Sequence, residues 1–414
     1  MIGLRPFRAW RPVPDKAHLV PSRSYVSYTE EQLREKLAGN PFSYLHIIHP
    51  DPGADAHLTR EERFTRVRRK FAEFVEEGWL IRDEEPSLYL YEQSRSGLLS
   101  RGIIGAIAVE DYQGGRVKVH EHTLKAREEL FKDYLHTTGV NAEPVLLAAP
   151  GGHGLDEATG HLRNERPTYD FTTTDRIRHR LWRIDDPAAI ADLQERFRKV
   201  DALYIADGHH RFASSARLAE ATGALGEAPM AWCLAFVVPE EHLHIHNFDR
   251  AITSLGGLDT EGMLKALAEV GPLGELDGAP TQPPPHGVVY LFTSKGWFAL
   301  TLPAPGPTAD AGERLDASIL STAVLGPVLG IHDLRTDPHV RFVPGTQGTA
   351  ELERLVRSGE AAVAFHLRPV DFAELKAVAD SGGCMPPKST YIEPKLRSGL
   401  TVYPFTDRTS SIGG

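Results

Sequence analysis

Tyr-Ile-Ala-Asp-Gly-His-His-Arg-Phe occupies residues 204–212. The apolar run over 202–206 predicts a strand, and the pattern over 210–221 predicts a helix. Gly208 lies between the two, and glycine accepts backbone angles that other residues resist. The first turn of a helix offers free backbone N–H groups and a partial positive charge, which suit a phosphate. The stretch therefore predicts a strand–turn–helix unit with an anion-binding turn.

The polar side chains of this turn are the first candidates for a binding site. Arg211 can make a two-pronged contact with phosphate oxygens, and His209 and His210 can carry a proton or coordinate an ion. The alternative is that Asp207 caps the helix and that the rest is a polar surface turn. Two histidines and an arginine beside a glycine at a strand end favour function. We therefore predict that the binding residues are Asp207, Gly208, His209, His210 and Arg211.

A second polar cluster follows a short strand at residues 117–123, Val-Lys-Val-His-Glu-His-Thr. Glu121 can act as a general base toward a hydroxyl, and neighbours such as His120 can tune its pKa. The alternative is that Glu121 lies in the first turn of a helix expected over 121–135, where a carboxylate favours the helix dipole. The candidate catalytic residues are Glu121, His120 and His209.

The third cluster lies near the end of the chain, Met-Pro-Pro-Lys-Ser-Thr-Tyr at residues 385–391 and Pro-Lys-Leu-Arg at 394–397. It is not a Walker motif, because Pro387 stands where the P-loop glycine belongs. The segment still concentrates phosphate-binding side chains in a loop that its prolines stiffen. A surface tail is the alternative. The further candidate binding residues are Lys388, Ser389, Thr390 and Lys395.

Two other patterns are weaker. His242, His244 and His246 would share one face of a strand, a spacing that can bind zinc, although no carboxylate or cysteine partner stands out. A polar strand face is the alternative, so no metal ligand is assigned. Gly-Gly-His-Gly at residues 151–154 could touch a phosphate, but a lone glycine-rich loop is a weak signal.

The composition limits the class of protein. The chain has 414 residues, of which 41% are hydrophobic and 25% charged, so two or three folded domains are expected. The net charge of -10 disfavours extended nucleic-acid binding. Two cysteines, and no apolar run typical of a signal peptide or a membrane span, predict a soluble cytoplasmic protein without a membrane partner.

Helical and strand patterns alternate irregularly along the chain, which predicts a mixed α/β (α+β) class. Thr-Glu-Glu-Gln at 29–32 and Thr-Arg-Glu-Glu at 59–62 have the spacing of capping boxes and open two helices. Asp-Pro at 186–187 opens another helix. The strands expected from apolar runs are 42–48, 88–91, 103–109, 144–149, 202–206, 230–238 and 361–367, with a hairpin over 288–302.

The same blocks resemble the domain-of-unknown-function 1015 family over nearly the whole chain. The matching blocks are Asn-Pro-Phe-Ser-Tyr-Leu-His at 40–46, His-Glu at 120–121 with Thr123, Ala-Asp-Gly-His-His-Arg at 206–211, Met-Pro-Pro-Lys-Ser-Thr-Tyr at 385–391, and the end of the tail to residue 400. One departure is Ser-Tyr-Val at 24–26, where members often carry Pro-Tyr-Asp-Val. Specificity is expected to differ if that segment contacts a ligand.

The family is distantly similar to the ParB/sulfiredoxin-like nucleotide-binding fold and to free-serine kinases. The resemblance implies a core at 96–250, with an N-terminal α/β segment at 1–95, a C-terminal α/β domain at 251–380, and a tail at 381–414 that folds back on the site. It implies that Glu121 activates a hydroxyl and that the 207–211 turn surrounds nucleotide phosphates. The acceptor, the nucleotide and the direction of transfer remain open.

The function expected from these observations is a phosphotransferase that uses ATP or ADP with Mg²⁺ on a small metabolite such as an amino acid, with free serine as the first candidate. A non-catalytic nucleotide-binding regulator is the first alternative. A metal-dependent hydrolase built on the three histidines is the second. The sequence leaves a homodimer open.

Overall fold

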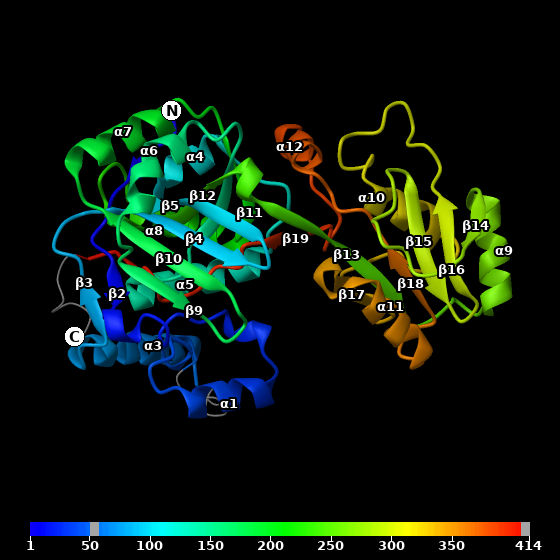
Figure 1. Cartoon of the computed structure of the whole chain (residues 1–414), viewed down its shortest axis with the longest axis horizontal. Coiled ribbons are helices and arrows are strands. Elements are labelled where there is room, and N and C mark those ends of the chain that lie inside the picture. The colour runs from blue at the N-terminus through cyan, green and yellow to red at the C-terminus, as the bar shows by residue number, and fades with distance from the viewer. Residues whose placement is uncertain (50–57, 407–414) are drawn as a thin grey trace. The chain divides into compact units, whose positions relative to one another are not determined.

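The computed structural model describes residues 1–49 and 58–406 (Figure 1). Contacts group the chain into two compact units. The first contains Met1–Lys118, Thr123–Leu243 and Pro394–Gly414, and the second contains Val119–His122 and His244–Glu393. Both units combine helices with a sheet, which confirms the predicted mixed α/β class.

The first unit is built on a large mixed sheet with strand order β6-β11-β8-β12-β5-β4-β10-β9, and β1 pairs with β5. Strand β11 is parallel to β6 and antiparallel to β8. The strands are β1 (Leu4–Arg5), β4 (Leu88–Arg95), β5 (Leu98–Ala108), β6 (Val117–Lys118), β8 (Val145–Ala149), β9 (Tyr169–Thr172), β10 (Arg178–Ile184), β11 (Leu203–Asp207) and β12 (Trp232–Pro239). Two small ladders pair β2 (Trp10–Pro12) with β3 (Leu80–Arg82) and β7 (Val140–Asn141) with β20 (Tyr403–Pro404).

Three helices of this unit, α1, α3 and α7, start at the predicted capping signals. Thr29 and Thr59 each form a complete capping box, and Asp186 caps the helix that opens with Pro187. These reciprocal bonds satisfy the N–H groups that a helix start leaves unpaired. The helices are α1 (Glu30–Gly39), α2 (Leu45–Ile48), α3 (Arg60–Glu76), α4 (Val109–Gln113), α5 (Lys125–Thr138), α6 (Leu155–Thr159), α7 (Pro187–Arg198) and α8 (His209–Thr222).

Helix α8 is the element that fixes the position of the 207–211 turn. It contacts β8 and β12, while α5 packs on α8 and α3 packs on α5. Phe212 is fully buried, and the small residues Ala213 and Ala216 are also buried on α8. Burial of one such aromatic side chain contributes about 1.5–3 kcal/mol. The start of α8 is therefore held on the sheet by its own apolar face.

Two expected elements differ from the structure. The expected strand over 42–48 is a turn followed by the single-turn helix α2, because Asn40 and Ser43 bond to the backbone of Phe42 and Leu45 and favour a helical turn. The helix expected from residue 121 begins at Lys125, after Leu124 as its N-cap.

The structure also divides the chain differently from the expected domain boundaries. Residues 95 and 96 lie in the hairpin that joins β4 to β5, and these strands share a continuous ladder. Residue 250 lies within β13 (His244–Ile252), which pairs with neighbours on both sides. A boundary at either place would break ladder hydrogen bonds.

The second unit contains a sheet in the order β14-β16-β15-β18-β13-β17, and β19 pairs with β13. Its core includes Leu267, Leu291, Leu300, Leu320 and Phe365. The predicted hairpin is confirmed as β15 and β16. The other bounds are β14 (Leu273–Leu276), β15 (Val288–Thr293), β16 (Gly296–Thr301), β17 (Val340–Pro344), β18 (Val363–His366), β19 (Thr390–Glu393), α9 (Thr260–Val270), α10 (Asp316–Leu320), α11 (Gly348–Arg357) and α12 (Phe372–Asp380).

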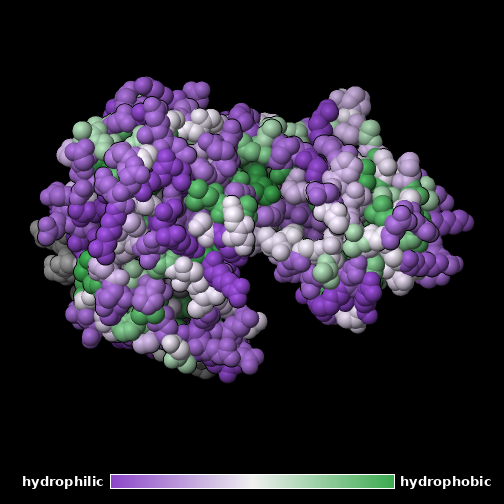
Figure 2. Space-filling model, viewed as in Figure 1, coloured by the Kyte–Doolittle hydropathy of each residue, from purple (hydrophilic) through white to green (hydrophobic). Residues whose placement is uncertain are grey.

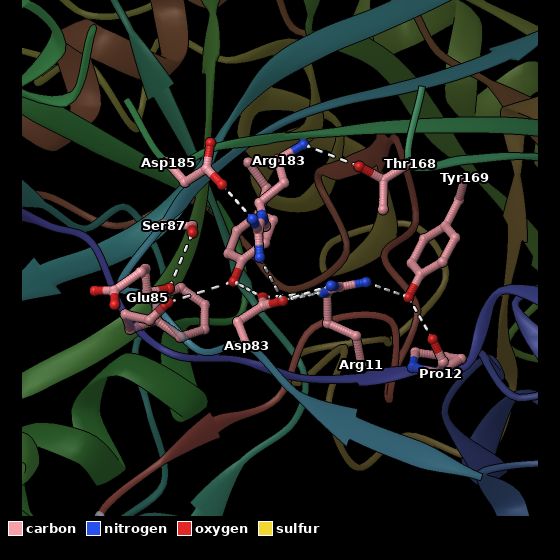
Figure 3. Close-up of polar contacts among 11 residues, drawn as sticks. Arg11, Pro12, Asp83, Glu85, Ser87, Thr168, Tyr169, Arg183 and Asp185 are labelled. Carbon is pink, nitrogen blue, oxygen red and sulfur yellow. Dashed lines mark hydrogen bonds and ion pairs between the residues drawn. The ribbon is translucent and has the colours of Figure 1, made fainter. Parts of the chain in front are cut away.

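A buried ion pair connects the first strands of the chain to the large sheet (Figure 3). Asp83 follows β3, and both its oxygens lie 2.9 Å from Arg11 Nε on β2. Tyr89 Oη donates to the same carboxylate at 2.6 Å, and Arg11 Nη1 donates to Tyr169 Oη at 2.6 Å. Because the partners are buried together, the network fixes where the N-terminal segment lies on β4 and β9.

Hydrophilic residues cover most of the face drawn in Figure 2, with smaller hydrophobic areas between them. Among the described residues, no helix combines the length and apolar character that a membrane crossing requires.

Candidate functional site

The predicted strand–turn–helix unit is present at residues 203–222. Strand β11 ends at Asp207, Gly208 has φ 101° and ψ 29°, and α8 begins at His209. The carbonyl of Gly208 accepts hydrogen bonds from the backbone N–H of Arg211 at 2.9 Å and of Phe212 at 3.1 Å. Gly208 is itself the N-cap, and no side chain from the described residues caps α8. The alternative in which Asp207 caps the helix is therefore wrong, and the helix start keeps its positive end available.

Gly208 is required for two reasons. Its positive φ lies in the left-handed region that favours glycine. A Cβ at this position would also lie 2.6 Å from Nε and 3.0 Å from Cζ of Arg211. The Arg211 side chain therefore folds back over the turn, in space that only a glycine leaves open.

The guanidinium of Arg211 is the centre of a small charged network. Its Nη2 donates to Asp207 Oδ2 at 2.6 Å, and its Nη1 donates to Glu143 Oε1. Lys395 Nζ donates to the other Asp207 oxygen at 2.8 Å, and Ser398 Oγ donates to Glu143 Oε2 at 3.1 Å. The Arg211 side chain is 18% exposed and that of Lys395 is 31% exposed. Two cations and two carboxylates thus meet at the start of α8.

The charge of this network is suited to exchange with an anion. Burial lowers the pKa of Arg211 to about 10, so the guanidinium still carries its positive charge at neutral pH. Arg211 and Lys395 are held by carboxylates that remain partly exposed, Asp207 at 36% and Glu143 at 29%. A phosphate that binds the same cations would replace carboxylate oxygens with phosphate oxygens, which form equally strong charge-assisted hydrogen bonds.

The two histidines of the turn have different surroundings. His209 is buried, with 5% of its surface exposed, whereas His210 is partly buried. Burial lowers the pKa of His210, the charge of Arg127 lowers it further, and Glu128 opposes both effects. The Nδ1 atom of His210 is buried and has no hydrogen-bond partner. His210 is therefore a neutral ring near pH 7, and its buried Nδ1 has no hydrogen-bond partner.

Five of the predicted site residues belong to the second unit: His120, Glu121, Lys388, Ser389 and Thr390. Within that unit the two segments lie close together, because Met385 N donates to the carbonyl of His120 at 2.9 Å. The acidic segment and the 388–390 segment are thus neighbours. Their meeting with the turn at 207–211 remains a proposal.

The 388–390 segment has a defined local structure. Lys388 has φ 56°, and its Nζ lies 5.2 Å from the centre of the Phe248 ring. Ser389 is buried, and its Oγ donates to the carbonyl of Pro386 at 2.8 Å. Thr390 opens β19 and pairs with β13. Only Lys388 of the three has a charged group to offer an anion.

The three histidines at 242–246 do not share a strand face as expected. His242 lies in a 3-10 turn before β13, where its ring contacts Asp156 and the carbonyl of Leu99 at 3.3 Å each. His246 instead pairs with Glu393 at 3.3 Å. Residues 1–49 and 58–406 contain no group of three side chains that could hold a metal ion.

The glycine-rich loop at 151–154 lies away from the turn. It follows the end of β8, and β8 runs antiparallel to β11, with Ala148 opposite Tyr204. The start of β8 therefore lies beside the end of β11, with Leu146 opposite Asp207. This register places Glu143, just before β8, at the turn, and it places the loop at 151–154 at the other end of the two strands.

Glu143 is the site residue that the sequence analysis missed. It precedes β8 in the segment Asn-Ala-Glu-Pro at 141–144. A polar residue before a buried strand is a weak local signal. Only the pairing of β8 with β11, across 68 residues of sequence, places it beside Arg211.

A buried cluster anchors the tail segment that carries Lys395 and Ser398. Arg397 Nη2 donates to Asp175 at 2.5 Å, and Asp175 also pairs with Arg23 at 2.5 Å. His179 lies beside this pair, with Nδ1 bonded to Tyr91 Oη at 2.7 Å. The position of the tail at the turn therefore depends on this cluster.

The cluster predicts a stability that depends on acid. Burial, with a further contribution from Arg397, lowers the pKa of His179 to about 3. In the unfolded chain the His179 imidazole binds a proton near pH 6.5, whereas in the folded chain it stays neutral until about pH 3. The free energy of unfolding should therefore fall as pH falls from about 6.5 toward 3. One such group contributes at most about 1.4 kcal/mol per pH unit. Urea unfolding at several pH values should show a shallower fall for His179→Gln. An identical pH dependence in both proteins would contradict this assignment.

The fold and the site together define a mixed α/β protein with a strand–turn–helix unit, at whose helix start Arg211 and Lys395 are paired with Glu143 and Asp207. The model of the family described as "Protein of unknown function (DUF1015)" matches residues 4–318. This match covers more than half of the chain, so the chain belongs to that family.

Several solved structures are similar to this chain at low identity. A free serine kinase in complex with AMP is 15% identical, with 72% of this chain and 90% of the kinase covered and a TM-score of 0.37. SbnI with a C-terminal truncation from Staphylococcus aureus is 13% identical, with 75% and 92% covered and a TM-score of 0.38. A conserved hypothetical protein from Pyrococcus furiosus is 16% identical, with 71% and 94% covered and a TM-score of 0.34. No curated protein matches the sequence.

Proposed function

We propose that the protein is a phosphotransferase that moves a phosphoryl group between a nucleotide, ATP or ADP, and a small hydroxylated metabolite such as serine. The observation that supports this most is the turn at 207–211, where Arg211 lies over Gly208 at the start of α8. Phosphoryl transfer requires mainly fixed positive donors around the phosphate and a group that orients the hydroxyl.

In this proposal the start of α8 and two side chains hold the phosphates. Backbone N–H groups at His209 and His210 offer donors at the positive end of the helix dipole. Arg211 and Lys395 exchange Glu143 and Asp207 for phosphate oxygens. Asp207 and Glu143 keep the two cations in place before the nucleotide arrives.

Glu121 is the proposed general base. It lies in sequence between Lys118 and Thr123, which both belong to the unit that carries the turn. A carboxylate can accept the proton of the acceptor hydroxyl as that oxygen attacks the phosphorus. His120 would orient it, and Lys388 would add a positive donor near the transferred group. The binding roles of Ser389 and Thr390 stay predictions, because the Ser389 hydroxyl already donates to the carbonyl of Pro386 and Thr390 pairs in β19. The ParB/sulfiredoxin-like label for the core stays a prediction.

Mg²⁺ fits the donors of this site. It binds in proteins through one or two carboxylates together with phosphate oxygens. Asp207 in the turn and Glu143 just before β8 would be the carboxylates that hold it. When bound, the ion would neutralise charge on the phosphates.

We expect the purified protein to exchange labelled phosphate between ATP or ADP and an amino-acid pool, with serine as the first acceptor to test. Glu121→Gln should reduce the exchange rate by about 10²–10⁴-fold, because it removes the base. The affinity for the nucleotide should stay the same, because Glu121 acts on the acceptor. Initial-rate assays and calorimetric titration with ADP measure the two quantities.

Glu227→Gln is the matched control, because this side chain is 87% exposed and lies outside the proposed site. If the Glu121→Gln variant exchanged phosphate at the full rate, Glu121 would not be the general base. Tight nucleotide binding with no exchange for any hydroxyl acceptor would replace the phosphotransferase with a nucleotide-binding regulator.

A further inference from the structure

A cavity of about 200 Å³ in the first unit borders the guanidinium of Arg211. Its walls come from helices α3 and α5, the segment around Tyr25, and residues 141–143. Phe64 and Val67 line it from α3, and Leu130 and Tyr134 line it from α5. The cavity shares Arg211, Glu143 and Ser398 with the network at the start of α8, whereas its helical walls have no part in the proposed phosphate contacts.

The walls of the cavity are apolar and rich in aromatic rings. Phe64 and Tyr134 pack edge to face with centroids 5.4 Å apart. Tyr25 and His49 stack in parallel, 5.3 Å apart with an interplanar angle of 5°. Tyr25 and Phe131 are also exposed, at 43% and 37%, so two aromatic rings lie at the surface of the cavity. Such rings favour a flat partner that stacks on them or meets their edges.

One end of the cavity is polar, and it is the end shared with the turn. Arg211, Glu143 and Ser398 line it, and these three residues are joined by hydrogen bonds. Arg63 also lines the cavity, and its Nε is buried without a hydrogen-bond partner. A buried donor without a partner costs free energy, so this atom favours an acceptor on a bound molecule.

We propose that this cavity binds the base of the nucleotide whose phosphates lie at the turn. The inference rests on the proposed function. Arg211 borders both the cavity and the turn, so one molecule with a flat ring at one end and phosphates at the other fits both. An apolar cavity of about 150 Å³ is large enough for a benzene-sized ring, so a space of about 200 Å³ accepts a larger flat ring. Arg63 would donate to an acceptor on the ring edge.

The test compares two ligands that share phosphates but differ in the base, ADP and tripolyphosphate, in calorimetric titrations. Leu130→Trp fills the cavity from a partly exposed position on α5. We expect it to weaken ADP binding by about tenfold or more, because the base loses its stacking contacts. Tripolyphosphate binding should stay within about twofold, because the turn is unchanged. Arg211→Ala should weaken both ligands.

Leu225→Trp is the matched control, because Leu225 is 81% exposed and does not line this cavity. If Leu130→Trp lowers the melting temperature, Phe131→Ala decides instead, with ADP binding about fivefold weaker and tripolyphosphate unchanged. Variants that bind ADP as tightly as the native protein would overturn the base pocket and leave the phosphate site intact. A native protein that binds neither ligand would refute the proposed function itself.

Discussion

Arg211→Ala is expected to lower the rate of phosphate exchange by about 10²–10³-fold, the usual effect of removing one preorganised charge donor from an active site. The guanidinium is the only group in the described turn that contacts both Glu143 and Asp207. Its loss removes the two-pronged phosphate contact and leaves two carboxylates near the start of α8. Nucleotide affinity should fall together with the rate. Exchange assays and ADP titrations measure both effects.

Arg211→Lys separates charge from geometry. A lysine keeps the positive charge but cannot make two parallel contacts, so an intermediate loss is expected. Arg198→Ala is the control, because that side chain is 54% exposed on α7 and pairs with Glu195. A melting curve confirms that each variant is folded. If Arg211→Ala exchanged phosphate as fast as Arg198→Ala, the turn would have no part in the chemistry.

Asp83→Asn is expected to destabilise the first unit by about 3–5 kcal/mol, because it leaves the charge of Arg11 buried without its counterion. The Asp83 side chain is 1% exposed and that of Arg11 is 8% exposed. The hydrogen bond with Asp83 raises the pKa of Arg11 although burial alone lowers it, so the arginine stays charged when folded. Tyr89 donates to one Asp83 oxygen and Arg183 to the other, and an asparagine has only one oxygen that can accept these bonds. Urea unfolding measures the change.

Asp185→Asn provides the comparison for this prediction. Asp185 also pairs with Arg183 in Figure 3, but its side chain is 45% exposed. Exposed pairs contribute only about 0.2–1 kcal/mol, since water replaces the lost partner. Equal losses for Asp83→Asn and Asp185→Asn would show that burial does not decide the strength of this network.

Several elements could be predicted because their signals are local. The capping boxes at Thr29 and Thr59 involve residues three apart, so the sequence contains both partners. The strand over 42–48 was predicted wrongly for a related reason. Tyr44, Leu45 and Ile47 are buried, but the side chains of Asn40 and Ser43 bond to nearby backbone and favour a helical turn.

The histidines at 242–246 show the limit of periodicity. Alternation places all three on one strand face only if the strand begins before His242, and β13 begins at His244. His242 and His246 then find carboxylate partners at Asp156 and Glu393, which lie far away in the sequence. The spacing alone could not show this, because strand boundaries depend on neighbouring strands.

Local sequence was enough to predict the turn at 207–211, because the apolar strand, the glycine with positive φ and the amphipathic helix involve residues that are neighbours in the chain. The charges that meet Arg211 depend instead on long-range packing. Glu143 and Lys395 lie 68 residues and more than 180 residues away from their partners, and they reach them through the register of β8 on β11 and the buried anchor of the tail. Such contacts depend on how strands pair and what the core buries, which no local pattern specifies.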